Sequence, residues 1–276
     1  MSKTIDAVEK AFQSTTEVLL GRKLANMKDY EKWLASDVIY IKKGKSALSG
    51  EEMYYSYLKE YNKDSKNAFI YTIGQASGHG TDRLVSLKDA TEIVSKRTAP
   101  SEEIKNLNLA NAAGVLKDIS YITHEIHEEP SIGIEECPNY AYSNYCYHGQ
   151  YYYYSKYCAY CLFPRHSEYA FGSWCVFDSK FCIRCHESSK LTRCFEVAES
   201  TNCRDSYFCY NCENLDNCMF CFNTKSKRYA IGYVEVGKEK YMEIKKMVLN
   251  DIASRLEKDK GLKWDIYNIG CAGKKK

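Results

Sequence analysis

The spacing of cysteine is the feature of this 276-residue sequence that most restricts its fold. Thirteen of the 14 cysteines lie between Cys137 and Cys221. Twelve of these are separated from one another by multiples of three residues, so they fall on one three-residue grid, and Cys175 is the exception. Chance would put about a third of the cysteines on any such grid, so the spacing predicts a repeated structure. The other grid positions are mostly small residues: Ser143, Gly149, Ser155, Ser167, Ala170, Ser173, Ser179, Ser188, Ser200 and Ser206.

A second period, of twelve residues, is superimposed on the first. The segment Ser143-Asn-Tyr-Cys146 recurs as Ser155-Lys-Tyr-Cys158, Ser167-Glu-Tyr-Ala170 and Ser179-Lys-Phe-Cys182. An α-helix repeats near 3.6 residues, so it does not produce periods of three and twelve. Four inward positions per coil explain the small grid residues. We therefore predict a tight β-solenoid of eight twelve-residue coils over residues 138–233, with coils stacked about 4.8 Å apart.

This pattern resembles the twelve-residue β-solenoids of the beetle antifreeze proteins, whose inward residues are also cysteine, serine and alanine at three-residue spacing. The resemblance covers residues 138–233 and concerns coil geometry, not homology. In that family the flat strand displays Thr-Cys-Thr, and the threonine ranks bind ice. The matching triplets here are Tyr145-Cys-Tyr147, Tyr157-Cys-Ala159, Tyr169-Ala-Phe171 and Phe181-Cys-Ile183, so the resemblance does not imply ice binding.

The flanking regions are expected to be helical, which makes the fold class α+β. We expect an α-rich domain with short strands over residues 1–125, a linker and first cap over 126–137, and a capping helix with a basic tail over 234–276. Apolar spacing and capping residues predict helices near residues 5–19, 27–34, 53–58, 86–96 and 101–122, and short strands at 38–41 and 68–73. The helix at 239–258 follows from an i, i+4 row of Ile244, Val248, Ile252 and Leu256.

The cysteines admit three chemical interpretations. Stacked thiols that behave as small hydrophobes are favoured, because the same columns hold Ser, Ala, Gly or Val in other coils. A zinc site is the alternative, since two Cys-x-x-Cys pairs can complete a tetrahedron, with His148 or His186 as further ligands. Its predicted ligands are Cys203, Cys209, Cys212, Cys218 and Cys221. Disulfides Cys203–Cys209 and Cys212–Cys218 are the third possibility.

No catalytic motif stands out. His124-x-x-His127 with Glu125, Glu128 and Glu129 has the residue types of a metal or acid–base cluster, but a polar linker is the commoner explanation. Gly78-His-Gly-Thr-Asp82 lacks the flanking elements of a phosphate loop. The formal net charge of +3 does not indicate nucleic acid. The sequence contains no run of eighteen apolar residues, so no membrane span is predicted. The absence of a signal-peptide core favours a cytoplasmic protein with reduced thiols.

The leading functional hypothesis is a non-enzymatic structural or assembly protein. In each strand the residues before and after the inward one point outward. Stacked one coil apart, they form two columns, here called ranks, that are expected to make an aromatic face. One rank holds Tyr145, Tyr157, Tyr169 and Phe181, and the other holds Tyr147, Ala159, Phe171 and Ile183. Such a face needs a cover, either the chain's own terminal helices or another subunit. The expected partner is a second copy, in a shell, filament or scaffold, or another protein. A thiolate zinc protein and an enzyme with an unrecognised N-terminal site are the alternatives.

Overall fold

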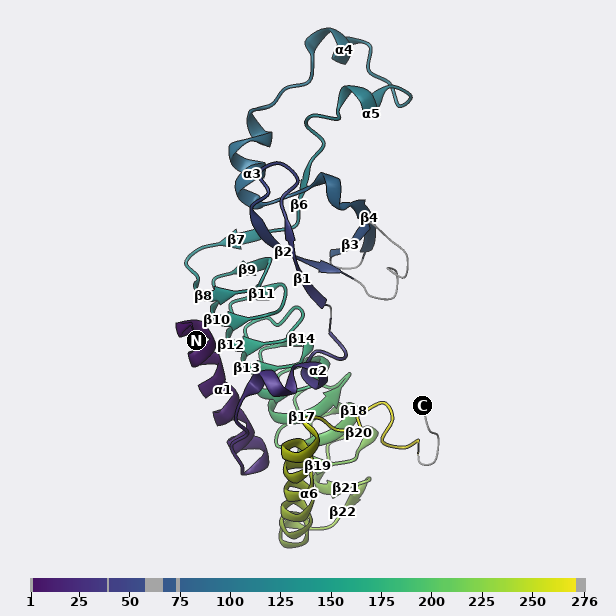
Figure 1. Cartoon of the computed structure of the whole chain (residues 1–276). Helices are drawn as coiled ribbons and strands as arrows, with labels where there is room; N and C mark the ends of the chain where they lie inside the picture. The colour runs from purple at the N-terminus through teal and green to yellow at the C-terminus, as the bar shows by residue number, and fades with distance from the viewer. Residues whose placement is uncertain (1, 39, 58–66, 73–74, 272–276) are drawn as a thin grey trace. The chain divides into compact units, whose positions relative to one another are not determined.

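The computed structural model describes residues 2–38, 40–57, 67–72 and 75–271 (Figure 1). The chain forms two compact units. The solenoid unit comprises Met1–Val38, Glu128–Glu135 and Tyr140–Lys276, and the hairpin unit comprises Ile39–His127 and Glu136–Asn139. This division differs from the predicted boundary at residue 125, because the first 38 residues belong with the solenoid.

The predicted solenoid is confirmed, with about nine turns at twelve-residue spacing. Its strands pair in parallel, one coil apart: Cys146 lies opposite Cys158, and Cys182 opposite Cys194. The ladder over the first face consists of β8 (Ile132–Glu135), β10 (Asn144–Tyr147), β12 (Lys156–Ala159), β13 (Glu168–Phe171), β15 (Lys180–Ile183), β17 (Thr192–Ala198), β18 (Tyr207–Glu213), β19 (Asp216–Met219) and β21 (Arg228–Ile231). The last coil ends in β22 (Val234–Glu235), which pairs antiparallel with β21.

The solenoid begins one coil earlier than predicted. Strand β8 pairs in parallel with β10, with Ile134 opposite Cys146, so residues 132–135 form a coil and not a linker. The signal was weak because this coil carries isoleucine where later coils carry cysteine or serine. Shorter strands on the other faces are β9 (Asn139–Ala141), β11 (Tyr152–Tyr153), β14 (Trp174–Phe177), β16 (His186–Ser189) and β20 (Phe222–Lys225).

The chain turns a corner at every third residue. The residue before each inward position has a left-handed backbone, with φ of +53° at Tyr145, +56° at Tyr157 and +55° at Asn217. Each such residue costs about 1–2 kcal/mol relative to right-handed backbone unless it is Gly, Asn or Asp. Stacking and hydrogen bonding between coils must offset that cost. The corner residues stack in columns along the solenoid, twelve residues apart.

Serine inside the tube satisfies backbone groups as well as fitting the space. The Oγ of Ser143 lies 2.9 Å from the carbonyl oxygen of Ala141 and accepts a hydrogen bond from the N–H of Ser155 at 3.1 Å. Ser200 does the same for the N–H of Cys212 at 3.0 Å. An unpaired buried amide would be costly, so hydroxyl groups stabilise the ladder where alanine would not.

The interior also holds a large ring that the pattern did not predict. Tyr152 occupies an inward position and is fully buried. Its hydroxyl donates to the carbonyl oxygen of Tyr147 at 3.2 Å and accepts from the N–H of Cys161 at 3.2 Å. The ring fits because Gly149 has no side chain: a Cβ there would collide with the Tyr152 hydroxyl.

Three helical segments pack on the first face of the solenoid, where α1 contacts successive strands from β8 to β17 (Figure 1). They are α1 (Lys3–Leu20), a short turn η1 (Met27–Tyr30) that continues into α2 (Glu31–Leu34), and α6 (Lys238–Asp259). The structure confirms the predicted C-terminal helix. Gly172 makes room for α2, since a Cβ at this left-handed corner would lie 2.5 Å from the carbonyl oxygen of Leu34.

The hairpin unit contains more strand than predicted. Its elements are β1 (Tyr40–Lys45), β2 (Glu52–Tyr57), β3 (Asn67–Thr72), β4 (Gln75–Gly80), β5 (Leu84–Val85) and β6 (Ile122–Thr123), with helices α3 (Leu87–Glu92), α4 (Ser101–Lys105) and α5 (Ala112–Val115). Strand β7 (Ile126–Glu128) begins in this unit, and its last residue belongs to the solenoid unit. Strands β1 and β2 form one antiparallel hairpin, and β3 and β4 another. The N-cap at Ser86 is confirmed, because its side chain accepts from the N–H of Asp89.

Two helix predictions in this unit are wrong. Residues 53–57 belong to strand β2, and residue 58 lies outside the described residues. Met53 and Tyr55, two positions apart as a strand requires, point inward and pack with Leu84. The predicted helix over 101–122 is broken into α4 and α5. Between them the side chain of Asn108 accepts from the N–H of Ala110 at 2.9 Å, a local bond that competes with helix continuation.

Candidate functional site

The solenoid cysteines are buried thiols. All fourteen cysteines of the chain are free. The Sγ of Cys161 is typical of the inward ones, 3.2 Å from the carbonyl oxygen of Ala159 and 3.3 Å from that of Ala170. Burial raises the pKa of Cys194 well above its usual range and that of Cys203 to about 12. Cys194 and Cys203 therefore stay protonated at neutral pH. Hydrogen bonds from Cys209 and Cys218 have the opposite effect on Cys221 and lower its pKa to about 3.

The predicted zinc ligands receive no support from their surroundings. Within residues 2–38, 40–57, 67–72 and 75–271, no group of three or more His, Cys, Asp or Glu is arranged to hold a metal ion. The predicted set lies in the last coils as free thiols: Cys203, Cys209, Cys212, Cys218 and Cys221. His186, which follows the inward Cys185, belongs to strand β16 and lies near the ring of Tyr267 instead. A zinc site here stays a prediction.

One of the two expected aromatic ranks is an internal core. Tyr147, Phe171 and Ile183 are at most 4% exposed, as part of a cluster with α1, α2 and α6. The ring of Phe171 lies 5.3 Å from that of Phe12 on α1. Further along, the hydroxyl of Tyr207 donates to the carbonyl oxygen of Leu19 at 2.9 Å. The expectation that this rank contacts another subunit is therefore corrected: the chain's own helices cover it.

The other rank lies at a corner of the coil and forms a continuous stack. The rings of Tyr145, Tyr157, Tyr169 and Phe181 are 5.3, 5.1 and 4.7 Å apart, with interplanar angles of 2°, 27° and 16°. All four residues are half-buried. Three of these tyrosines and helix α1 line an open groove of about 560 Å³, here called the tyrosine groove. Its α1 residues are Lys3, Asp6, Ala7, Lys10, Ala11 and Ser14.

A second stack, at another corner, was not recognised in the sequence. The rings of Tyr142, Tyr154 and His166 are 5.0 and 4.8 Å apart and nearly parallel, at 16° and 5°. Tyr142 is 38% exposed and Tyr154 is 51% exposed. The signal that identifies this exposed aromatic column is the twelve-residue spacing of its rings. Its residues do not flank the cysteines, so the cysteine pattern does not mark the column.

The most highly charged buried cluster joins three segments of the solenoid unit. Arg184 and Glu196, one coil apart, are 2% and 0% exposed and form an ion pair. Arg184 also donates to Asp37, to the carbonyl oxygen of Trp33 at 2.5 Å and to Ser36 Oγ at 2.6 Å. The second carboxylate oxygen of Glu196 accepts from the N–H of Ile266 at 3.1 Å.

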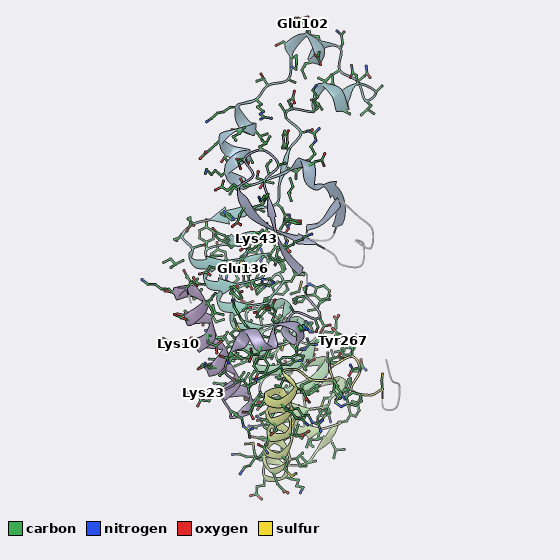
Figure 2. The ribbon with its side chains drawn as sticks, in the orientation of Figure 1. Lys10, Lys23, Lys43, Glu102, Glu136 and Tyr267 are labelled. Carbon is green, nitrogen blue, oxygen red and sulfur yellow. The ribbon has the colours of Figure 1, made fainter. Side chains whose placement is uncertain are left out.

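This cluster acts as a clamp. Burial raises the pKa of Glu196 to about 7, against the opposing effect of Arg184. Burial and the neighbouring Arg184 lower the pKa of His186 to about 4, so its imidazole is neutral at physiological pH. All three side chains are shielded from solvent, which leaves a substrate no approach. The arrangement ties the α2 region and the C-terminal segment, on which Figure 2 labels Tyr267, to the coil.

The histidine–glutamate segment does not form an acid–base site. His124 is buried, and desolvation lowers its pKa to about 4. The carboxylate of Glu125 accepts from the N–H of Leu87 at 2.8 Å, at the start of α3. The glycine-rich segment at 78–82 continues β4 into a turn over Thr81–Arg83. These residues stabilise the ends of local elements.

The class of protein that the fold defines is a cysteine- and serine-laddered β-solenoid with aromatic corner columns. Searches of protein-family models, curated proteins and solved structures found no match to this chain. No helix among the described residues combines the length and the apolar character that crossing a membrane requires.

Proposed function

We propose that this chain is a non-enzymatic structural protein whose rigid solenoid assembles with a second copy through the exposed aromatic column. The observation that carries the proposal is the stack of Tyr142, Tyr154 and His166, whose rings are held in parallel and remain exposed. Fixed tyrosine rings lose little conformational entropy on binding, and aromatic residues are enriched in protein interfaces.

A second copy suits this surface because it has the same axial repeat. In two solenoids that lie side by side, the rings of both columns have the same spacing of one ring per coil. Each ring of one copy can therefore contact a ring of the other along the length of the column. The polar continuation of the column supplies a rim: the side-chain amide of Asn202 donates to that of Asn214 at 2.6 Å. Burying a large apolar side chain contributes about 1.5–3 kcal/mol. Three rings make a small interface, so we expect association that depends on concentration.

Sedimentation velocity over a hundredfold concentration range tests the proposal. The wild-type chain is expected to associate, and Tyr154→Asp is expected to remain a monomer with unchanged circular dichroism. Aspartate tolerates the left-handed backbone of this corner, so the variant removes the ring without new backbone strain. Asn211→Asp, which places a charge at an exposed left-handed corner of a different column, is the matched control and should associate as the wild type does. A wild-type chain that stays monomeric throughout would refute the proposal.

A further inference from the structure

The two walls of the tyrosine groove, helix α1 and the column of tyrosines, both run along the solenoid axis and carry regularly spaced side chains. Lys3 and Lys10 are seven residues apart on α1, which places them on one face and about 10 Å apart along the helix axis. On the opposite wall, Tyr145 and Tyr169 are two coils apart, with intervening ring spacings of 5.3 and 5.1 Å. Because α1 contacts successive strands of the ladder, two lysines span nearly the same length as three phenols.

The charge in and beside the groove is mostly positive. Lys3 and Lys10 are exposed, and neither forms an ion pair with another described residue; Figure 2 labels Lys10 on α1. The strand residues that precede Tyr157 and Phe181 are the exposed Lys156 and Lys180, and Lys180 pairs with Glu168 at 3.2 Å. Lysines therefore lie on α1 and along the strand side of the row of phenols, although Asp6 lies between the two helix lysines and Glu168, which precedes Tyr169, lies between the two strand lysines.

The rings offer their hydroxyl edges and not their faces. Each ring in the column is covered by the next one, and at the start of the column Gly133 lies so close to Tyr145 that a Cβ would be 2.8 Å from its ring. Stacking of nucleic-acid bases needs free aromatic faces, which this column does not provide. Burial raises the pKa of Tyr169, so its phenol remains a hydrogen-bond donor at neutral pH.

We propose that the tyrosine groove binds a linear acidic polysaccharide lying along the solenoid axis. Its carboxylates pair with Lys3 and Lys10, and its hydroxyl and ring oxygens accept hydrogen bonds from Tyr145, Tyr157 and Tyr169. An extended chain of pyranose units advances per unit by a distance close to the coil spacing, so successive units meet successive phenols. This site is separate from the exposed aromatic column and does not depend on assembly.

Binding of a fluorescent linear oligogalacturonate, followed by anisotropy, tests this site. Tyr157→Phe keeps the stacked ring and removes only the hydroxyl, and Lys10→Gln removes only the charge. Tyr157→Phe is expected to weaken binding about fivefold, the effect of losing one neutral hydrogen bond, and Lys10→Gln by about tenfold or more, the effect of losing one charge-assisted bond. The matched controls are Tyr154→Phe in the exposed column and Lys23→Gln beyond the end of α1, and both should stay within twofold of wild type.

The competing outcomes are separable. Failure of the wild-type chain to bind the acidic probe, or equal binding of a neutral oligosaccharide of the same length, would overturn the proposal. Tighter binding of single-stranded DNA would assign the groove to nucleic acid instead and would also overturn it. Monomeric Tyr154→Asp should bind the probe as wild type does, so loss of assembly and loss of binding are measured independently.

Discussion

Two aromatic surfaces of the same solenoid differ in their exposure to solvent. The rank of Tyr147, Phe171 and Ile183 is buried under the helices, whereas the column of Tyr142 and Tyr154 is exposed. Both repeat every twelve residues and both are rich in large rings. What separates them is the rest of the chain: the residues that cover the first rank lie before residue 38 and after residue 237. The twelve-residue period therefore determines which residues form a continuous surface. Whether that surface is buried or exposed depends on the flanking helices.

The largest expected effect comes from placing a charge in the covered rank. Phe171→Asp buries an unpaired carboxylate against Phe12, which should destabilise the solenoid unit by on the order of 3–5 kcal/mol or unfold it. Chemical denaturation measures the change in the free energy of unfolding. Tyr154→Asp, the same kind of substitution in the exposed column, should alter stability by less than about 0.5 kcal/mol. Similar losses in the two variants would erase the distinction between the surfaces.

The next effect concerns the clamp beside the covered rank and appears as a pH dependence. The pKa of His186 is about 4 in the folded chain and 6.5 in the absence of burial. Because folding lowers the pKa of His186, the unfolded chain takes up a proton at a higher pH than the folded chain does. The folded state is therefore most stable above the unfolded pKa, and this stabilisation is lost as the pH falls from the unfolded pKa to the folded one. The loss between pH 6.5 and 4 should reach about 3 kcal/mol.

His186→Phe removes this titration. Its free energy of unfolding should therefore fall less than that of wild type when the pH is lowered from 7 to 4. Tyr267→Phe, which changes the exposed ring beside His186 and removes no group that titrates between pH 4 and 7, is the control and should follow the wild-type profile. Parallel profiles for His186→Phe and wild type would show that the buried imidazole does not control acid stability.

A smaller effect is expected inside the tube. Cys182 is fully buried between coils, so Cys182→Leu should cost about 1–3 kcal/mol through overpacking, while Cys182→Ala should be mild. Thermal unfolding of both variants measures the difference. Tyr152 fits the tube beside Gly149, and Leu191 and Leu215 are buried at inward positions of another column. Cys182 itself is fully buried among its neighbours, so equal stability for the two variants would contradict a filled interior at this position.

The sequence predicted the parts of the fold that repeat locally. The cysteine grid and the twelve-residue period led to the solenoid, and the i, i+4 row led to α6. The first coil was missed because Ile134 replaces the small inward residue. Strand β2 was missed because its tyrosines suit helix and strand alike, and only packing against Leu84 settles the choice. The left-handed corners were missed because tyrosine, the commonest corner residue of the early coils, carries no such preference.

The candidate sites were predicted only in part. Tyr145, Tyr157 and Tyr169 were singled out, but the groove they share with α1 joins residues more than 130 positions apart in the chain. No local pattern encodes such a contact. The clamp was also invisible, because Arg184 and Glu196 look like ordinary surface charges until the α2 region and Ile266 cover them.

The central claim is that the two aromatic surfaces differ in access to solvent and to a second copy. Hydroxyl-radical footprinting of the folded chain, read by mass spectrometry at low and high protein concentration, tests it most directly. We expect Tyr147 and Tyr207 to be protected at every concentration. Tyr142 and Tyr154 should be modified in dilute solution and become protected as the protein concentration rises. Rapid modification of Tyr147 and Tyr207 in the folded chain, or modification of Tyr154 that does not change with concentration, would contradict it.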